Sequence, residues 1–167
     1  MSHARTLLLL RHAEAEDTNV GRRDQERPLT VLGQRQASAV GAYLRQQEIS
    51  VDQALCSPAT RARQTWEGLG LAAEVDYDPR LYNAGSDTIL AVLQEVPSEV
   101  RTALVVGHAP GVPALAHQLA DPFDSDAEAF AAIEHRFPTA TLVMMAFHGD
   151  WAELRVARLE QARLQPS

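Results

Sequence analysis

Thr6-Leu7-Leu8-Leu9-Leu10-Arg11-His12 is the stretch that decides the fold, because four leucines run directly into an arginine and a histidine. A short, continuous apolar run is typical of a strand that is buried on both faces of a sheet. Residues 51–56 and 102–106 have the same character and are predicted to be further buried strands. All three runs are followed by histidine, serine or arginine side chains, which can take part in catalysis or binding. Packing of the core alone does not require such residues at these positions.

Helical signals separate these runs and complete an alternating pattern. Thr30 is expected to cap one helix, and Ser57 to cap another that has Pro58 as its first residue and ends at Gly70. The other expected elements are helices opening at Ser86, Gly111 and Ser125, a strand at 74–77, and a closing hairpin of residues 141–147 and 151–157 turned at Gly149-Asp150. The alternation predicts a single domain, residues 1–167, folded as a three-layer α/β/α sandwich with a mainly parallel sheet.

Composition excludes several classes of protein. The net charge of −7, with no basic tail, argues against a nucleic-acid partner. No apolar run reaches membrane-spanning length, so no membrane association is expected. The single cysteine, Cys56, permits no internal disulfide, which favours a reducing, cytoplasmic location. All fifteen basic residues are arginine, which removes a lysine Schiff base and the phosphate-binding lysine of P-loop enzymes.

The strand ends themselves indicate an anion site. In open, mainly parallel sheets, ligands bind beyond the carboxyl ends of the strands. Arg11-His12 follows the first strand, Ser57 the second, with Arg61 in the helix beyond it, and His108 the third. Arginine presents a planar fork that matches phosphate oxygens, and free N–H groups at a helix start add to such a site. Phosphate is therefore the expected ligand, with Arg11, Arg61, His108 and Ser57 as the expected phosphate-binding residues.

A histidine beside bound phosphate suggests nucleophilic catalysis. A neutral imidazole can attack phosphorus, while Arg11, Arg61 and His108 hold the transferring oxygens. A zinc site is a weaker interpretation, because a third ligand is wanting and the arginines repel a cation. Cys56 also fails as a nucleophile: four residues separate it from Arg61, whereas cysteine phosphatases have five, and it sits in an apolar strand. We expect neither metal nor cofactor.

Three motifs at these strand ends resemble those of the histidine phosphatase superfamily, also called phosphoglycerate mutase-like. Leu10-Arg11-His12-Ala13 resembles the family's RHG motif. Residues 57–65, Ser-Pro-Ala-Thr-Arg-Ala-Arg-Gln-Thr, resemble its second motif, and residues 106–111, Val-Gly-His-Ala-Pro-Gly, its third. Residues 27–30, Arg-Pro-Leu-Thr, followed by Gly33 and Ala37, are similar to the family's early helix. The resemblance implies a phosphoglycerate mutase-like fold, with His12 as the phosphorylated nucleophile and Arg11, Arg61 and His108 as phosphate ligands.

Two departures bear on the substrate. Ala13 stands where the family has glycine, and residues 80–84, Arg-Leu-Tyr-Asn-Ala, contain no carboxylate where mutase-like members carry a glutamate. The short chain and the missing acid resemble the SixA-type branch, which implies phosphohistidine in a protein as the substrate. Glu14 and Glu16 follow the nucleophile and are the remaining candidates for a proton donor.

Two other functions stay open. A phosphatase for small phosphoesters would use the same residues, and a phosphate-binding module without turnover would use most of them. His12 separates the last interpretation from the others, because binding alone does not require a nucleophile.

Overall fold

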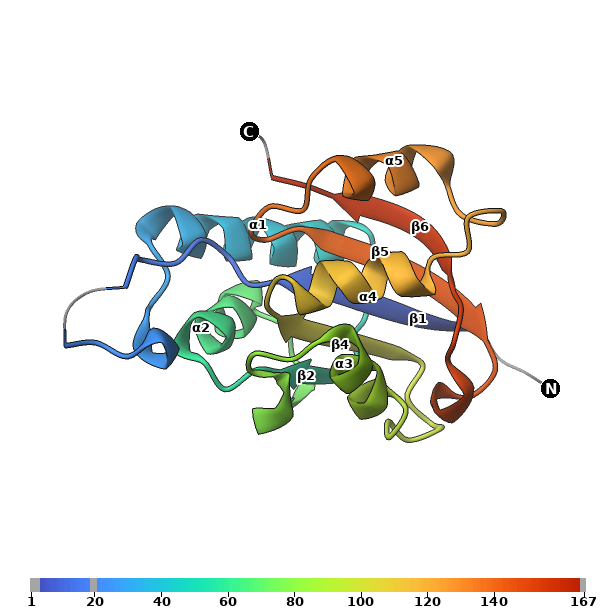
Figure 1. Ribbon diagram of the computed structural model, residues 1–167, viewed down its shortest axis with the longest axis horizontal. Coiled ribbons are helices and arrows are strands. Elements are labelled where there is room, and N and C mark those ends of the chain that lie inside the picture. Colours follow the sequence, from blue (N-terminus) through green and yellow to red (C-terminus); the bar gives the residue numbers. More distant parts are fainter. Residues whose placement is uncertain (1–3, 19–20, 166–167) are drawn as a thin grey trace.

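The computed structural model describes residues 4–18 and 21–165, and its centre is one six-stranded mixed sheet in the order β3-β2-β4-β1-β5-β6 (Figure 1). The strands are β1 (Ala4–Arg11), β2 (Gln53–Cys56), β3 (Glu74–Tyr77), β4 (Thr102–Gly107), β5 (Leu142–His148) and β6 (Arg158–Arg163). The pairs β1·β4, β2·β4 and β2·β3 are parallel, and β5 is antiparallel to both of its neighbours. One strand, β5, therefore runs against the other five, and the prediction of a mainly parallel sheet is confirmed.

The leucine run of β1 is buried on both faces of this sheet, as its sequence predicts. Leu7 and Leu9 face one apolar cluster, whereas Leu8 and Leu10 face the other. All four side chains are fully buried. Because side chains alternate across a strand, one short segment supplies the centre of both cores.

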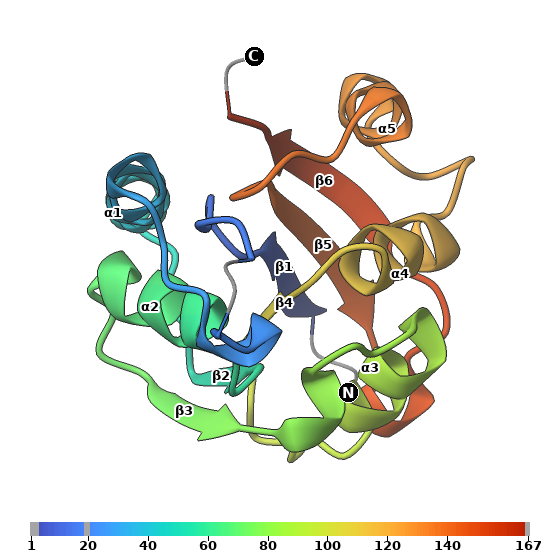
Figure 2. The ribbon, with the colours of Figure 1, turned by 60° about the vertical axis from the view of Figure 1, so that its left-hand side comes forward.

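Helices cover the two faces. They are α1 (Val31–Gln46), α2 (Thr60–Leu69), α3 (Ser86–Leu93), α4 (Gly111–Leu119) and α5 (Ala127–His135). Figure 2 shows α1 and α2 on one side of the sheet, and α3, α4 and α5 on the other. The three-layer α/β/α sandwich is thereby confirmed. None of the described helices is long and apolar enough to cross a membrane.

The closing hairpin is the main error of the sequence-based prediction. Residues 151–157 do not form the last strand: Trp151–Glu153 is a 3-10 turn, and β6 begins at Arg158. Trp151 is fully buried, packs against Phe147 with ring centroids 5.0 Å apart, and donates its indole N–H to the Val100 carbonyl at 2.7 Å. The Trp151 side chain therefore packs into the end of the core, and its segment does not pair with β5.

The start of α2 also differs from the prediction. The helix begins at Thr60, and its N-cap residue, Ala59, has no capping side chain. The Ser57 hydroxyl accepts from the Ala59 amide at 3.2 Å and lies in a turn before the helix. Arg61 nevertheless falls in the first helical turn, as expected, and Gly70 ends the helix in the left-handed region at φ 67°.

Candidate active site

The predicted site residues meet beyond the carboxyl ends of three neighbouring strands. His12 follows β1, Ser57 follows β2 and His108 follows β4, and backbone hydrogen bonds continue the sheet through two of these positions. The His12 amide donates to the Gly107 carbonyl at 2.9 Å, and the Ser57 amide donates to the Val106 carbonyl at 3.0 Å. Parallel pairing therefore fixes the register at which the three segments leave the sheet.

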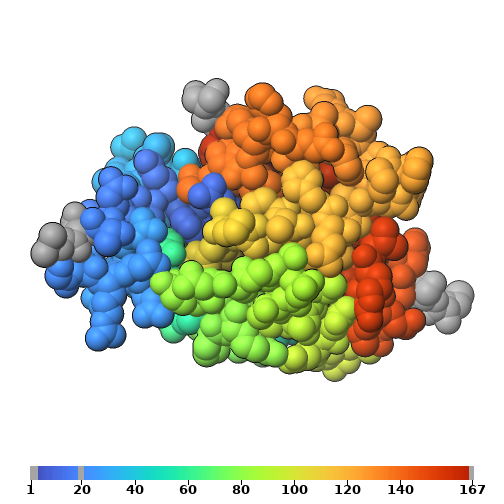
Figure 3. Space-filling model, viewed as in Figure 1, coloured from blue at the N-terminus to red at the C-terminus, as the bar shows by residue number. Residues whose placement is uncertain are grey.

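These segments line a common pocket. It is lined by Arg11, His12, Glu14, Ala15, Asp17, Arg27, Arg61, Asn83, His108, Ala109 and Thr139. In the space-filling view, the blue loop after β1, the green segment before α3 and the yellow start of α4 meet on the same face of the molecule (Figure 3). All four predicted catalytic side chains are among the lining residues, although they come from three different parts of the chain.

The loop after β1 is held from several sides. The Ala13 amide donates to the Thr65 hydroxyl at 3.0 Å, and that hydroxyl donates to the Arg61 carbonyl at 2.7 Å, which ties the loop to α2. Gly33 of α1 lies directly under the loop, since a Cβ there would stand 2.0 Å from the Glu14 carbonyl oxygen. Only glycine fits at this contact, so the helix and the loop approach each other closely.

His12 is held as a neutral imidazole with a defined tautomer. Its Nδ1 lies 2.7 Å from the Ala13 carbonyl oxygen. A carbonyl can only accept, so Nδ1 carries the proton and Nε2 keeps the lone pair. Burial, chiefly, and then the positive charges of Arg61, Arg11 and Arg27 lower the pKa of His12 to about 4. Near pH 7 the ring is therefore unprotonated at Nε2.

His108 lies beside His12, with the two ring centroids 5.2 Å apart. Its Nε2 is 2.7 Å from the Ser57 hydroxyl oxygen, and its Nδ1 is buried without a hydrogen-bond partner among the described residues. Burial, chiefly, lowers the pKa of His108 to about 3. The rings of Tyr82 and His108 pack in a T-shaped arrangement, with their centroids 5.7 Å apart. Ser57, which was expected to cap α2 and to bind phosphate, is fully buried and is not among the residues that line the pocket. Its hydroxyl contacts His108 instead.

The two arginines differ in their partners. Arg11 donates from Nη1 to the Phe137 carbonyl at 2.8 Å. The side chain of Arg61 is only 6% exposed, and both of its terminal nitrogens donate to Asp24: Nη1 to the carbonyl at 2.8 Å and Nη2 to Oδ2 at 3.1 Å. Nε of each arginine is buried without a partner among the described residues. Donors therefore remain for an anion.

Asp24 is the residue that the sequence analysis missed. It lies in a 3-10 turn, Asp24–Glu26, inside the polar loop before α1. Its carboxylate accepts from Arg61, from the Arg27 Nε at 3.0 Å and from the Tyr82 hydroxyl. No local pattern predicts that this loop folds back on residues 37 and 58 positions later in the chain.

The two candidate proton donors lie in different surroundings. Glu14 lines the pocket, and its Oε2 accepts from the Thr30 hydroxyl at 3.1 Å. Glu16 is not among the lining residues, and its carboxylate lies 4.0 Å from Arg22. The structure therefore places Glu14, and not Glu16, among the residues that line the pocket of the predicted nucleophile.

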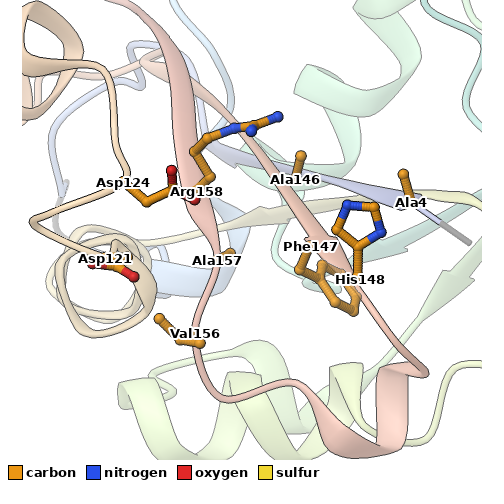
Figure 4. A pocket seen from close by; sticks show the side chains of 9 residues that line it. All are labelled: Ala4, Asp121, Asp124, Ala146, Phe147, His148, Val156, Ala157 and Arg158. Carbon is orange, nitrogen blue, oxygen red and sulfur yellow. The ribbon is translucent and has the colours of Figure 1, made fainter. Parts of the chain in front are cut away.

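Other chemical groups lie elsewhere. Cys56 is fully buried, and burial raises the pKa of its thiol to about 12. Within residues 4–18 and 21–165, no group of three or more His, Cys, Asp or Glu side chains is placed to hold a metal ion. A second hollow, which contains His148 and Arg158, lies at the opposite end of β1 (Figure 4). At about 3.3 Å per residue, the eight residues of β1 separate it from His12 by roughly 25 Å.

Comparison with known proteins identifies relatives over most of the chain. The family model of the histidine phosphatase superfamily (branch 1) matches residues 7–164. An uncharacterised protein of Mycobacterium tuberculosis is 39% identical over 145 residues, which cover 87% of this chain and 91% of that protein. The phosphohistidine phosphatase SixA of Escherichia coli is 30% identical over 119 residues, or 68% of this chain and 73% of SixA.

One solved structure is similar to this chain over nearly the whole length of both proteins. The protein from Nakamurella multipartitia, assigned as a phosphohistidine phosphatase SixA, superposes with a TM-score of 0.86 at 40% sequence identity. The superposition covers 99% of this chain and 98% of that one. The similarity therefore includes β6 and α5, beyond the segment in which the sequence motifs lie.

Proposed function

Because the chain belongs to the histidine phosphatase superfamily, branch 1, we propose that it removes phosphate from phosphohistidine in a protein, with His12 as the nucleophile. The chain is a hydrolase of the SixA-like branch by similarity. The proposal adds the substrate and the roles of individual residues.

One observation carries the role of His12. Its Nδ1 donates to the Ala13 carbonyl at 2.7 Å, so the lone pair is on Nε2, and its pKa of about 4 keeps that lone pair free at neutral pH. Cationic donors from Arg11 and Arg61 line the same pocket. A nucleophile without a proton, beside donors for phosphate oxygens, is what attack on phosphorus needs.

The reaction has two transfers. The His12 Nε2 lone pair forms a bond to phosphorus while the phosphorus–nitrogen bond of the substrate breaks, and its electron pair stays on the departing imidazole, which is protonated. Water then attacks phosphorus, the bond to His12 breaks, and phosphate leaves with His12 restored. Arg11, Arg61 and His108 hold the three phosphoryl oxygens during both transfers.

The surroundings of the site favour an imidazole leaving group. An alkoxide needs a proton delivered by a positioned acid, which contributes roughly 10²–10⁴-fold. Residues 80–84 carry no carboxylate. Of the two carboxylates that line the pocket, Glu14 accepts from the Thr30 hydroxyl and Asp17 is exposed to solvent. Imidazole is far less basic than an alkoxide and takes its proton from solvent near an ordinary pKa of about 6.5. A site without a dedicated strong acid therefore suits phosphohistidine better than a sugar phosphate.

The nucleophile is tested by trapping the intermediate. Wild-type protein is incubated with a histidine-phosphorylated phosphotransfer domain, quenched in alkali and examined for an acid-labile phosphoryl group. His12→Ala is expected to carry none, whereas His117→Ala, an exposed histidine of α4, is expected to behave as wild type. A phosphoryl group that persists in His12→Ala contradicts the assignment.

The substrate is tested by a panel. We expect kcat/KM for the phosphorylated domain to exceed that for sugar phosphates and p-nitrophenyl phosphate. Faster turnover of a sugar phosphate would favour the small-phosphoester function instead. Absence of both turnover and phosphoryl-enzyme with every substrate, combined with measurable phosphate binding, would identify a binding module.

A further inference from the structure

We propose that Asp24 is a positioning residue, which holds the end of the Arg61 guanidinium so that its side edge is presented to the phosphoryl group. The inference rests on the proposed function only in taking the pocket as a phosphate site. It adds a residue that neither the sequence motifs nor the roles assigned above include.

The covalent geometry of arginine makes the distinction between its edges concrete. A guanidinium has five N–H donors in a rigid plane. Nη1 and Nη2 form its end, and Nε with Nη2 forms a side edge that can take a second bidentate partner. Asp24 occupies the end, through its backbone carbonyl at 2.8 Å and its carboxylate at 3.1 Å. The Nε of Arg61 is buried and has no partner among the described residues, so the side edge keeps its donors.

Asp24 is itself fixed by three segments of the chain. Its carboxylate accepts from Arg61 in α2, from Arg27 in its own loop at 3.0 Å, and from the Tyr82 hydroxyl in the segment before α3. Tyr82 also packs edge-on against His108, which lines the pocket. A carboxylate anchored at three points is able to hold a guanidinium in one orientation, whereas a freely rotating side chain is not.

The same contacts exclude a different role. The Tyr82 hydroxyl, first, and then the charge and hydrogen bond of Arg61 lower the pKa of Asp24 to about 2. At neutral pH Asp24 therefore has no proton to give, so it is not the missing general acid. It acts through its negative charge and its geometry.

A competing function of the same contact is inhibition. Asp24 and phosphate are both anions on Arg61, so a carboxylate that simply competes with substrate would weaken phosphate binding. The two interpretations make opposite predictions for removal of the charge. Loss of a positioning residue weakens phosphate binding, whereas loss of a competitor strengthens it.

The experiment measures the dissociation constant of inorganic phosphate by calorimetry on the full chain. We expect Asp24→Asn to raise it about tenfold, as for one misplaced charge-assisted hydrogen-bonding group. Glu26→Gln is the matched control, because it removes one carboxylate charge from the same turn, and Glu26 pairs with Arg23 at 3.9 Å instead of with Arg61. Tyr82→Phe removes one anchor of Asp24 and is expected to give a smaller increase in the same direction.

A double-mutant cycle tests whether Asp24 acts through Arg61. In an Arg61→Ala background, Asp24→Asn is expected to change the phosphate dissociation constant by less than about twofold, since coupled residues are not additive. Unchanged or tighter phosphate binding by Asp24→Asn, with a melting temperature equal to that of Glu26→Gln, overturns the proposal. So does a full tenfold effect in the Arg61→Ala background.

The outcomes separate this inference from the proposed function. Phosphate binding is measured without turnover, so Asp24→Asn can fail its expectation while the wild type still forms a phosphoryl group on His12. Conversely, a wild type that forms no such group leaves the binding measurement intact. The split between KM and kcat gives a further readout, because a purely structural change would not move KM alone.

Discussion

The two histidines of the site are expected to make the stability of the protein depend on pH in the acid range. His12 and His108 are 7% exposed each, and their pKa values are lowered, mainly by burial, to about 4 and about 3. In the unfolded chain both have the ordinary value of about 6.5. Between pH 6.5 and 4 the unfolded state therefore binds more protons than the folded state, so the free energy of unfolding falls as the pH falls.

The magnitude follows from the separation of the two pKa values. One proton bound only in the unfolded state changes the free energy of unfolding by about 1.4 kcal/mol per pH unit. For His12, lowered to about 4, the full effect between pH 6.5 and 4 is about 3 kcal/mol. The contribution is fully present above pH 6.5 and is lost as the pH falls through the folded-state value. His108 acts in the same direction.

Urea unfolding at pH 7, 6, 5 and 4.5 measures this slope. His12→Asn is the informative variant, because its amide can still donate to the Ala13 carbonyl but cannot titrate. We expect its free energy of unfolding to fall less steeply than that of wild type, by up to about 1.4 kcal/mol per pH unit. His117→Asn, on the exposed face of α4, controls for the substitution itself.

The result that refutes the reasoning is a parallel pH dependence of wild type and His12→Asn between pH 6.5 and 4.5. It would mean that His12 titrates alike in the folded and unfolded chains. Nitrogen chemical shifts of the His12 ring supply an independent check. They are expected to report a neutral ring, protonated at Nδ1, at pH 5.

Two substitutions test how the scaffold holds the site. Gly33→Ala places a Cβ 2.0 Å from the Glu14 carbonyl oxygen, so it is expected to cost about 1–3 kcal/mol in urea unfolding and to lower activity. In Gly85→Ala the new Cβ meets nothing within 4 Å, so this control should show only the smaller cost of alanine at the N-cap of α3. Ser57→Ala removes the hydrogen-bond partner of His108 Nε2 and is expected to lower kcat about tenfold, and an unchanged kcat would show that Ser57 does not orient this ring.

The central strands and the meeting of the site residues could be predicted from the sequence, because both depend on local patterns. Four consecutive leucines indicate burial on both faces, and β1 contributes to both cores. Parallel strands place their carboxyl ends at one edge, so His12 and His108 meet although 96 positions separate their numbers.

The errors arise where distant contacts decide the outcome. Residues 151–157 alternate in a strand-like manner, but Trp151 is buried against Phe147 and bonded to the Val100 carbonyl. The true last strand, Arg158–Arg163, buries fully only Leu159, so it lacks the apolar alternation by which strands are found. Asp24 was missed for a related reason, because its partners lie in other elements and no spacing marks them.

In the proposed function, the positive charges of the pocket serve both phosphate binding and catalysis. Arg61 and Arg11, the proposed donors for phosphate oxygens, line the same pocket as His12, and their charges also help to lower its pKa. In the proposed function, the groups that attract the anion therefore add to the effect of burial, which is the main reason that the proposed nucleophile carries no proton at neutral pH. A lysine would place its charge without this fixed plane of donors. The proposed role of Asp24 fits this arrangement. It binds the end of the Arg61 guanidinium, so the remaining donors of Arg61 are held in one orientation beside a neutral His12.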